Sequence, residues 1–326
     1  MCLKKKIILT FFIIICAGCV LFCSILCYKN IIAIQTESDL DGGKDVNKEE
    51  YIYKEDLMHL GYSVSDIEII EDKISTTDVK TYLLSTKYKN LTNFISSPFF
   101  KMQNLERYQN YFDNTSYTAD TCVLHVEIGL DNPFYTNIKD TDLTKSELMI
   151  VNKYYKLPSD YVPTLVSISK EYGSGKLEPR AYEAFKLMCD NALLENIKLK
   201  SISAYRSYST QNSLYKSYAK KDGTKKADTY SARPGHSEHQ TGLAIDINTS
   251  SSKVHFENTK EYNWLINNAY KYGFILRYPN NKTYITGYKY EPWHWRYVGV
   301  DVATKIYEED ITYEEYVIKY RLLSDL

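Results

Sequence analysis

The chain has 326 residues and a formal net charge of −1. This length accommodates about two domains, and nothing in the nearly balanced charge suggests a surface for nucleic acid. Hydrophobic residues make up 44% of the chain and charged residues 25%, which is typical of a soluble globular protein and excludes a wholly disordered or fibrous chain.

The N-terminus has the features of a membrane-targeting segment. Lys4, Lys5 and Lys6 precede an uncharged, mostly apolar run from residue 7 to residue 27, which is long enough to cross a bilayer as a helix. Lysines on the N-terminal side keep that end inside the cell. We therefore expect residues 1–30 to be an uncleaved, single-pass signal anchor in the cell membrane, with the body of the protein extracellular.

A lipoprotein anchored at Cys19 is the alternative interpretation of this segment, because small residues precede that cysteine as at a cleavage site. Cys16 is an unusual residue at its position before Cys19, and the apolar run continues beyond it to Cys27. We therefore favour the anchor, followed by a polar linker over residues 31–50.

Residues 51–120 are predicted to form a small helical region. Ser65–Glu68 has the pattern of a capping box, and Ser75–Asp78 resembles a second helix start. The region carries no constellation of catalytic side chains, so we expect it to space or dock the domain that follows.

Residues 121–147 are predicted to form a connecting strand and loop. From Cys122 to Leu130 the side chains alternate in the manner of a strand, which makes His125 a partly buried structural residue. Cys122 and Cys189 are the two cysteines of the body. Whether they pair is left open, although Cys189 lies on an apolar helix face and so resembles a buried free thiol.

Residues 148–326 are predicted to form an α+β domain, because helices and short strands follow one another without regular βα alternation. A helix that begins at Pro179–Arg180 carries apolar side chains at helical spacing and is expected to pack on the core. The predicted strands are 149–158 (with a turn), 199–205, 243–247, 274–278 and 293–298, joined by helices that begin near Ser209 and Asn258 and by a polar loop, 220–240.

Two separate segments of this domain carry the residues of a hydrolytic metal site. His239 and Asp246 lie in one glycine-containing segment, and His294 follows elsewhere with Glu291 three residues before it. Three ligands and a nearby carboxylate leave one coordination position for water and provide a base beside it, as in catalytic zinc sites. The sequence therefore predicts Zn²⁺ bound by the two histidines and the aspartate.

Asp246 stands on an apolar strand between Ile245 and Ile247, whose side chains point to the opposite face. Burying an unpaired charge costs several kcal/mol, and a metal ion supplies the partner. A salt bridge to Arg233 or Arg206 is the alternative.

His294 and Glu291 flank Pro292, which interrupts a regular strand. That irregularity can bring both side chains to one site, although regular strand spacing would not. His236 and His255 compete for the ligand role: His236 lies near His239, and His255 follows a serine-rich turn and is expected to be exposed. We predict that neither binds the metal.

These residues predict a specific division of labour. Glu291 would act as general base toward water and then as acid toward the leaving amine. A cation is expected near the oxyanion that develops on the attacked amide, and Arg206, which follows the predicted strand ending at Tyr205, is the best candidate. Gln211 and Ser237 can hold polar groups of the substrate.

The stretch from about Leu148 to Val298 resembles the VanY-like zinc D-alanyl-D-alanine carboxypeptidases, which have the Hedgehog/DD-peptidase fold. The matching motifs are Tyr205–Gln211 (YRSYSTQ), Ser237–Asp246 (SEHQTGLAID) and Glu291–His294 (EPWH). The resemblance implies a compact α+β domain in which helices pack on a small antiparallel sheet that carries the metal.

The resemblance also implies roles for individual residues. Zinc would lie on His239, Asp246 and His294, with Glu291 as the catalytic base and Arg206 at the scissile carbonyl. Residues expected to contact the substrate are Gln211, Ser231, Arg233 and Ser237, to which we add Trp293, the neighbour of His294.

The predicted function is removal of a C-terminal D-alanine from peptidoglycan stem peptides by an enzyme held at the membrane, with no nucleic-acid partner. An L,D-carboxypeptidase or a stem-peptide endopeptidase on the same site remains an alternative, as does a non-catalytic, zinc-containing binding module. Glu291 favours catalysis, because a structural zinc site needs no base at that position.

Overall fold

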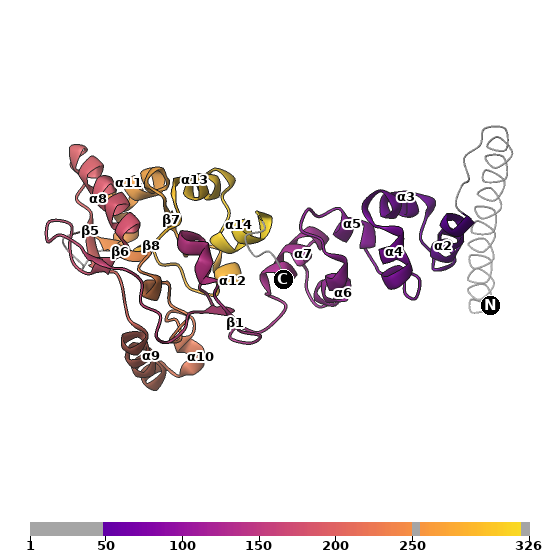
Figure 1. The fold of residues 1–326 in the computed structure, drawn as a ribbon, viewed down its shortest axis with the longest axis horizontal. Helices are drawn as coiled ribbons and strands as arrows, with labels where there is room; N and C mark the ends of the chain where they lie inside the picture. The colour runs from indigo at the N-terminus through magenta and orange to yellow at the C-terminus, as the bar shows by residue number, and fades with distance from the viewer. Residues whose placement is uncertain (1–47, 250–254, 321–326) are drawn as a thin grey trace, which may run out of the picture. The chain divides into compact units, whose positions relative to one another are not determined.

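The computed structural model describes residues 48–249 and 255–320 (Figure 1). Within this part the chain divides into two compact units, one formed by residues 48–97 and 101–105 and the other by residues 98–100 and 106–320. No helix of the described residues is long and apolar enough to cross a bilayer. The predicted anchor, residues 1–30, and most of the predicted linker lie outside them.

The first unit is helical, as its capping patterns predict. Ser63 caps the second of its helices by accepting a hydrogen bond from the backbone N–H of Asp66, so that helix begins two residues before the predicted start. Ser75 caps the next helix through Asp78, as predicted. The elements are α2 (Lys48–His59), α3 (Val64–Lys73), α4 (Thr76–Asp78), the π-helical η1 (Val79–Leu83), α5 (Leu91–Ile95) and the 3-10 turn η2 (Met102–Asn104).

The second unit mixes helices with short strands, which confirms the predicted α+β class. Its α-helices are α6 (Leu105–Asp113), α7 (Ala119–Ile128), α8 (Pro179–Leu194), α9 (Tyr208–Asp222), α10 (Thr224–Ala227), α11 (Lys260–Asn268), α12 (Thr283–Thr286), α13 (Val300–Glu309) and α14 (Tyr313–Lys319). The 3-10 helices are η3 (Leu143–Leu148), η4 (Glu238–Thr241), η5 (Phe256–Asn258) and η6 (Ala269–Tyr272). The strands are β1 (Lys139–Asp140), β2 (Tyr155–Lys156), β3 (Val166–Ser167), β4 (Lys176–Leu177), β5 (Lys200–Ser203), β6 (Ala244–Asn248), β7 (Phe274–Leu276) and β8 (His294–Tyr297).

The predicted strand from Cys122 to Leu130 is wrong, because Cys122 to Ile128 belong to helix α7 (Ala119–Ile128). Thr118 caps the first turn, and Gly129 ends the helix in the left-handed conformation at φ 99°. Most side chains of α7 are buried, including the polar His125. A helix buried all round lacks the one-sided apolar stripe that distinguishes helix from strand in a sequence.

The two body cysteines do not form a disulfide. Cys122 and Cys189 are both free and buried. Cys189 lies on the apolar face of α8, as predicted, and the structure thus answers the question that the sequence left open.

A four-stranded antiparallel sheet positions the predicted site. Its order is β5–β6–β8–β7, and each strand overlaps a strand predicted from the sequence. In addition, β1 pairs with β2 in parallel, and β3 pairs with β4 in antiparallel orientation.

One face of the four-stranded sheet packs on the main hydrophobic core. Ile245, Ile247 and Trp295 belong to this core, together with Phe185 of α8 and Leu265 of α11. All five side chains are at most 2% exposed. Alternation along a strand then places Asp246 and His294 on the other face.

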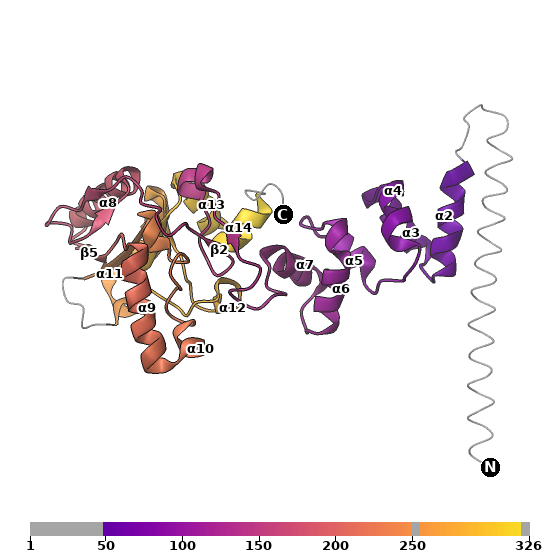
Figure 2. The same ribbon diagram turned by 60° about the horizontal axis from the view of Figure 1, so that its bottom comes forward.

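Two further packing layers complete the unit. Helix α9, which lies beside α10 (Figure 2), contributes to the cavity on the site face. Ala303 of α13 and Tyr313 and Val317 of α14 belong to one hydrophobic cluster with Ile275 of β7, and α13 contacts β7 directly. Both helices therefore contribute to the core beside β7, the strand next to β8.

Candidate metal centre and active site

The pairing of β6 with β8 brings the two strand-borne predicted ligands together. Asp246 and His294 are directly opposed in the antiparallel register. His239 reaches the same place from η4, which ends at Gly242 in the left-handed conformation, at φ 71°. A Cβ on Gly242 would lie about 3.0 Å from the Leu165 side chain, so both the backbone conformation and the limited space favour glycine in this turn.

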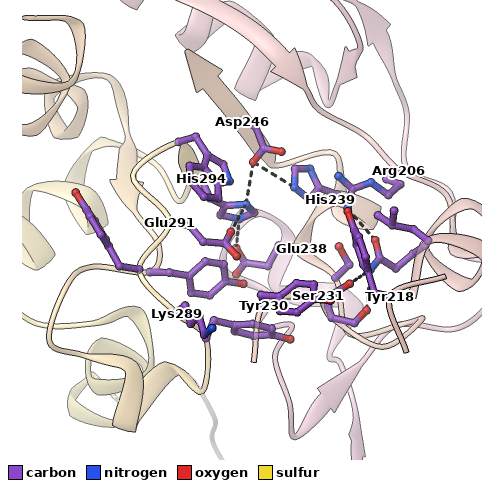
Figure 3. A pocket seen from close by; sticks show the side chains of 18 residues that line it. Arg206, Tyr218, Tyr230, Ser231, Glu238, His239, Asp246, Lys289, Glu291 and His294 are labelled. Atoms are coloured by element: carbon purple, nitrogen blue, oxygen red, sulfur yellow. Dashed lines mark hydrogen bonds and ion pairs between the residues drawn. The ribbon is translucent and has the colours of Figure 1, made fainter. Parts of the chain in front are cut away.

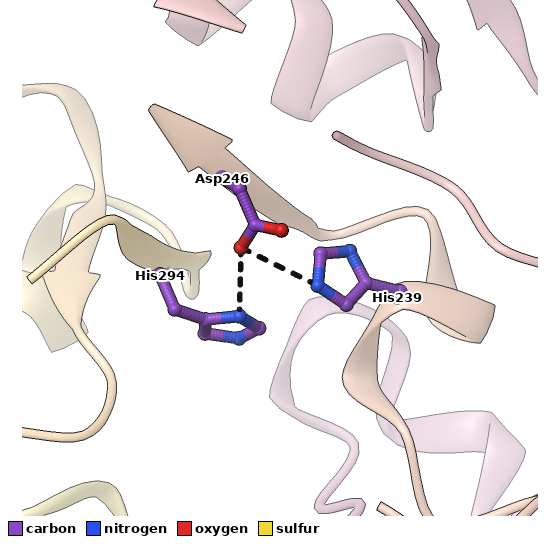
Figure 4. A group of neighbouring side chains, drawn as sticks. All are labelled: His239, Asp246 and His294. Carbon is purple, nitrogen blue, oxygen red and sulfur yellow. Dashed lines mark hydrogen bonds and ion pairs between the residues drawn. The ribbon is translucent and has the colours of Figure 1, made fainter. Parts of the chain in front are cut away.

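The three predicted ligands form one compact, buried group (Figure 4). Their nearest ligand atoms all lie within 4.8 Å of one another. One oxygen of Asp246, Oδ1, lies 3.4 Å from Nε2 of His239 and 3.2 Å from Nδ1 of His294. The imidazole planes are nearly perpendicular, at 88°. The prediction that these three side chains converge is confirmed.

In each imidazole, the nitrogen that points away from Asp246 has its own hydrogen-bond partner. The other nitrogen of the ring is the one left for a metal. Nδ1 of His239 lies 2.7 Å from the carbonyl oxygen of Ala204 and must donate to it. Nε2 of His294 lies 3.5 Å from Oε2 of Glu238. Nε2 of His239 and Nδ1 of His294 are therefore the nitrogens that face Asp246, and each would offer its lone pair to a metal that replaces a proton there.

The electrostatics of this group favour a cation. Burial alone would lower the pKa of His294, but its hydrogen bonds with Asp246 and Glu238 outweigh burial and raise that pKa to about 9. Burial would raise the pKa of Asp246, yet the charges and hydrogen bonds of both histidines hold it well below its usual range. Burial lowers the pKa of His239, which keeps that imidazole available as a neutral ligand.

The three residues suit a metal ion. Two imidazole nitrogens and an ionised carboxylate converge, each imidazole is oriented by a second partner, and the group opens on a cavity. Two histidines with one carboxylate and an open position form a donor set of hydrolytic metal sites. Asp246 forms no salt bridge with Arg233 or Arg206 among the described ion pairs, so the alternative partner is not supported.

Glu291 lies next to this group, as predicted. The backbone N–H of His294 donates to the carbonyl of Glu291, 3.1 Å away, and closes a turn over Pro292. The turn places Oε2 of Glu291 3.9 Å from Nδ1 of His294. Burial raises the pKa of Glu291 to about 7, which lies in the range where a carboxyl group can both accept and return a proton at neutral pH.

A cavity of about 420 Å³ opens in front of the metal group (Figure 3). It brings together nine of the ten predicted site residues, which come from four different parts of the domain. They are Arg206, Gln211, Ser231, Ser237, His239, Asp246, Glu291, Trp293 and His294.

Arg206 is held at the cavity by its guanidinium. Nη1 donates to Oε1 of Gln211 at 2.8 Å, and Nη2 donates to Oγ of Ser203 at 3.1 Å. Gln211 in turn donates from Nε2 to the carbonyl of Ala232 at 2.7 Å. The predicted substrate residue Gln211 therefore also fixes the predicted oxyanion partner.

Arg233 is the predicted site residue that does not line the cavity. Its Nη2 donates to Asp228 at 2.8 Å, and its guanidinium lies 4.1 Å from the ring centre of Tyr135. In this conformation Arg233 supports the loop behind the cavity wall instead of pointing toward a substrate.

The two competing histidines lie outside the metal group, as predicted. Nδ1 of His236 lies 2.7 Å from the carbonyl of Asn152, and its ring meets Tyr135 edge-on. His255 is exposed, with 85% of its side chain accessible.

The sequence interpretation missed two sets of residues. Glu238 is fully buried behind His294 and bonded to Arg277 and Arg296. Its position between Ser237 and His239, inside the motif, was the available signal. The cavity wall also contains residues whose side chains were not predicted to face the site: Leu214, Tyr218, Tyr230, Ala232, Tyr278, Tyr288, Lys289 and Tyr290.

Comparison with known proteins places this site in a family. The family VanY, described as D-alanyl-D-alanine carboxypeptidase, matches residues 174–300. YodJ of Bacillus subtilis is 41% identical over 212 residues, 60% of this chain and 78% of that protein. A D-alanyl-D-alanine carboxypeptidase of Enterococcus faecalis is 34% identical over 196 residues, 57% of this chain and 71% of that protein.

A solved structure shares its fold with more than half of this chain. The LD-carboxypeptidase LdcB, determined to explain peptidoglycan recognition, is 40% identical with a TM-score of 0.53 and covers 58% of this chain and 94% of that one. The residues matched by the family include the metal group, Glu291 and Arg206. The chain belongs to the VanY-like D-alanyl-D-alanine carboxypeptidase family.

Proposed function

We propose that this protein is a zinc-dependent D-alanyl-D-alanine carboxypeptidase that removes the terminal D-alanine of peptidoglycan stem peptides. The observation that carries the proposal is the carboxylate of Glu291, 3.9 Å from a ligand nitrogen of a buried His–Asp–His group at the wall of an open cavity. A zinc site that only stabilises a fold is closed by four protein ligands and needs no base beside it.

Zinc is the metal that the donor set favours. Zn²⁺ is bound by imidazole nitrogen and carboxylate oxygen and keeps an open position when three protein ligands hold it. His239, Asp246 and His294 would hold it here. Bound at this site, zinc supplies Lewis acidity toward a water molecule and toward the carbonyl of the scissile amide.

The chain's own side chains move the proton and balance the charge. Glu291 accepts a proton from the attacking water and returns it to the amine of the departing D-alanine. Arg206, preset by Gln211 and Ser203, faces the negative charge that develops on the carbonyl oxygen. Its geometry is fixed before substrate binds, so little reorganisation accompanies the reaction.

The cavity suits the end of a peptide. Buried polar side chains of Gln211, Ser231 and Ser237 line it together with several tyrosine rings and Trp293. Polar groups fix the orientation of a ligand, and the rings cover its apolar parts. Trp293 is 38% exposed, so it is available for contact with the stem.

We also propose that the enzyme acts on the outer face of the membrane. The support is the sequence alone, in which three lysines precede the apolar run 7–27. Labelling of cells with a radioactive fatty acid distinguishes the two anchors: a signal anchor takes up no label at Cys19, whereas label that disappears in Cys19→Ser would establish the lipoprotein.

An L,D-carboxypeptidase is the second candidate, because LdcB, at 40% identity, is an LD-carboxypeptidase. The test is incubation of the purified full-length chain with a defined pentapeptide ending in D-Ala-D-Ala and a tetrapeptide ending in one D-Ala. Release of D-alanine from the pentapeptide, abolished by a chelator and restored by zinc, is the expected result. Release from the tetrapeptide alone would establish the L,D activity.

If the protein binds zinc but cuts neither stem, the endopeptidase and binding-module alternatives remain. Incubation with two stem peptides joined by a peptide cross-link distinguishes these two alternatives. Only an endopeptidase would cleave an internal bond of this substrate and release shorter fragments.

A further inference from the structure

Four charged side chains are buried behind His294 and are used by none of the steps above. Glu238, Arg277 and Arg296 have fully buried side chains, and the side chain of Glu314 is 2% exposed. Two acids and two bases balance in charge. Glu238 lies on η4, Glu314 on α14 and Arg296 on β8, and Arg277 directly follows β7. The network therefore joins four parts of the domain.

The two oxygens of Glu238 have different partners. Oε1 accepts from Nε of Arg277 at 2.7 Å and from Nη1 of Arg296 at 2.9 Å. Oε2 lies 3.5 Å from Nε2 of His294. The arginines therefore hold the carboxylate from one side. Its other oxygen meets the outer nitrogen of the His294 imidazole (Figure 3).

The network continues to the C-terminal helix. Nη1 and Nη2 of Arg277 donate to the two oxygens of Glu314 at 2.8 and 2.6 Å. Arg277 thus bridges Glu238 and Glu314. Arg296 is anchored separately, through Nη2, to the backbone carbonyls of Glu147 and Met149.

We propose that Glu238 is a positioning residue that fixes His294 for metal binding, and that Glu314 of α14 supports it through Arg277. This inference rests on the zinc site of the proposed function. By accepting from Nε2, Glu238 keeps the proton on that nitrogen and leaves the lone pair on Nδ1, the nitrogen that faces Asp246 and His239. Outer partners of this kind commonly change metal affinity about 10- to 100-fold.

A purely structural role would not need this arrangement. Buried ion pairs are weak evidence for stability, since apolar side chains of similar volume often serve as well. Here one oxygen of Glu238 is bound by two arginines, and the other is directed at the imidazole. A carboxylate held in this way orients a metal-binding histidine.

The test compares zinc affinity in folded variants, measured by competition with a chromophoric chelator. In Glu238→Gln the side-chain amide has a single acceptor oxygen, and both arginines need that oxygen as their acceptor. The NH₂ group of the glutamine must then face Nε2 of His294. The imidazole must then give up that proton and carry it on Nδ1. The expected result is a loss of zinc affinity of about 10- to 100-fold, with a changed visible spectrum of the Co²⁺-loaded protein. Glu238→Asp, which keeps the charge, should recover part of the affinity.

Glu314→Gln tests the second step, and Glu315→Gln on the same helix is its matched control. Glu315 caps α14 and its side chain is partly buried, and glutamine also serves in a capping box. We expect zinc affinity to fall about threefold to tenfold in Glu314→Gln and to be unchanged in Glu315→Gln.

The outcomes separate the claims. Wild-type protein that binds no zinc would overturn the proposed function and this inference together. Wild-type protein that binds zinc while Glu238→Gln binds it equally well would overturn the inference alone. If circular dichroism shows that Glu238→Gln is unfolded, zinc affinity is measured in Glu238→Asp and Glu314→Gln instead. Wild-type zinc affinity in both of these variants would contradict the inference.

Discussion

Asp246 and His294 face each other directly across the antiparallel pair β6–β8, with Oδ1 and Nδ1 3.2 Å apart. Both residues lie in the regular part of this strand pair. On the opposite face of the sheet, the neighbouring Ile245 and Trp295 are buried in the hydrophobic core. Two of the three proposed ligands are therefore set by the sheet itself, so a metal that binds there meets a preformed site.

Substituting Asp246 by asparagine should remove zinc binding without unfolding the protein. The amide is of equal size but carries no charge, and a lost ligand should cost more than the roughly 10- to 100-fold typical of an outer partner. Chelator competition measures the change. Asp190→Asn, on the outside of α8 beside Lys186, is the control, and equal affinity in both variants would show that Asp246 is not a ligand.

Gly242 should be required for the site as well as for the fold. A side chain there adopts the left-handed conformation, at a cost of about 1–2 kcal/mol, and its Cβ also crowds Leu165. Gly223 has a φ of 80°, but a Cβ added there would meet no atom within 4 Å. We expect Gly242→Ala to lower both the free energy of unfolding and zinc affinity, and Gly223→Ala to lower only the former. Urea unfolding and zinc titration measure the two effects, and indistinguishable variants would contradict the tight-turn argument.

Arg206→Met should reduce kcat by about 100- to 1000-fold, the usual effect of losing a group that stabilises an oxyanion. KM should change much less, because the charge develops in the transition state. Steady-state release of D-alanine gives both constants. Arg180→Met, which alters an exposed arginine bound to Glu147 and Glu178, should leave both constants near wild type. A large KM effect with unchanged kcat would instead assign Arg206 to ground-state binding.

Lys153 should make stability depend on pH. Its side chain is 2% exposed and its Nζ lies over the ring of Tyr288 at 4.0 Å. Burial lowers its pKa to about 8, against an opposing effect of the Asp228 charge. In the unfolded chain a lysine titrates near about 10.4. Between these values the unfolded chain binds more protons, so this residue makes the free energy of unfolding rise with pH.

The measurement compares wild type with Lys153→Met by urea unfolding from about pH 8 to about pH 9.5. The wild-type free energy of unfolding should rise relative to that of the variant by roughly 1 kcal/mol. Comparing the two proteins removes the contribution of the tyrosines, which both share. Parallel pH curves would show that Lys153 has an ordinary pKa in the folded protein.

Much of the site could be predicted because its residues fall in a few short segments, each with a recognisable local pattern. Asp246 is marked by apolar neighbours on a strand, and Glu291 and His294 are three residues apart. The positions of the four main strands follow from similarly local patterns. The family motifs then add the expected roles.

What the sequence could not provide depends on contacts between distant segments. Glu238 and Glu314 are far apart in the chain and meet only through Arg277. Helix α7 has the pattern of a strand because it is buried on nearly all sides, and burial from all sides removes the helical period. Arg233 has the sequence position of a substrate ligand, whereas its pairing with Asp228 follows only from the fold.

The most direct test of the central claim compares zinc-loaded wild type with Glu291→Gln on the D-Ala-D-Ala pentapeptide. The variant keeps the shape of the side chain and the three proposed ligands, so zinc affinity should stay within a few-fold of wild type. D-alanine release should fall by about 100- to 10,000-fold, since the base is lost. Wild-type release by zinc-loaded Glu291→Gln would contradict the account.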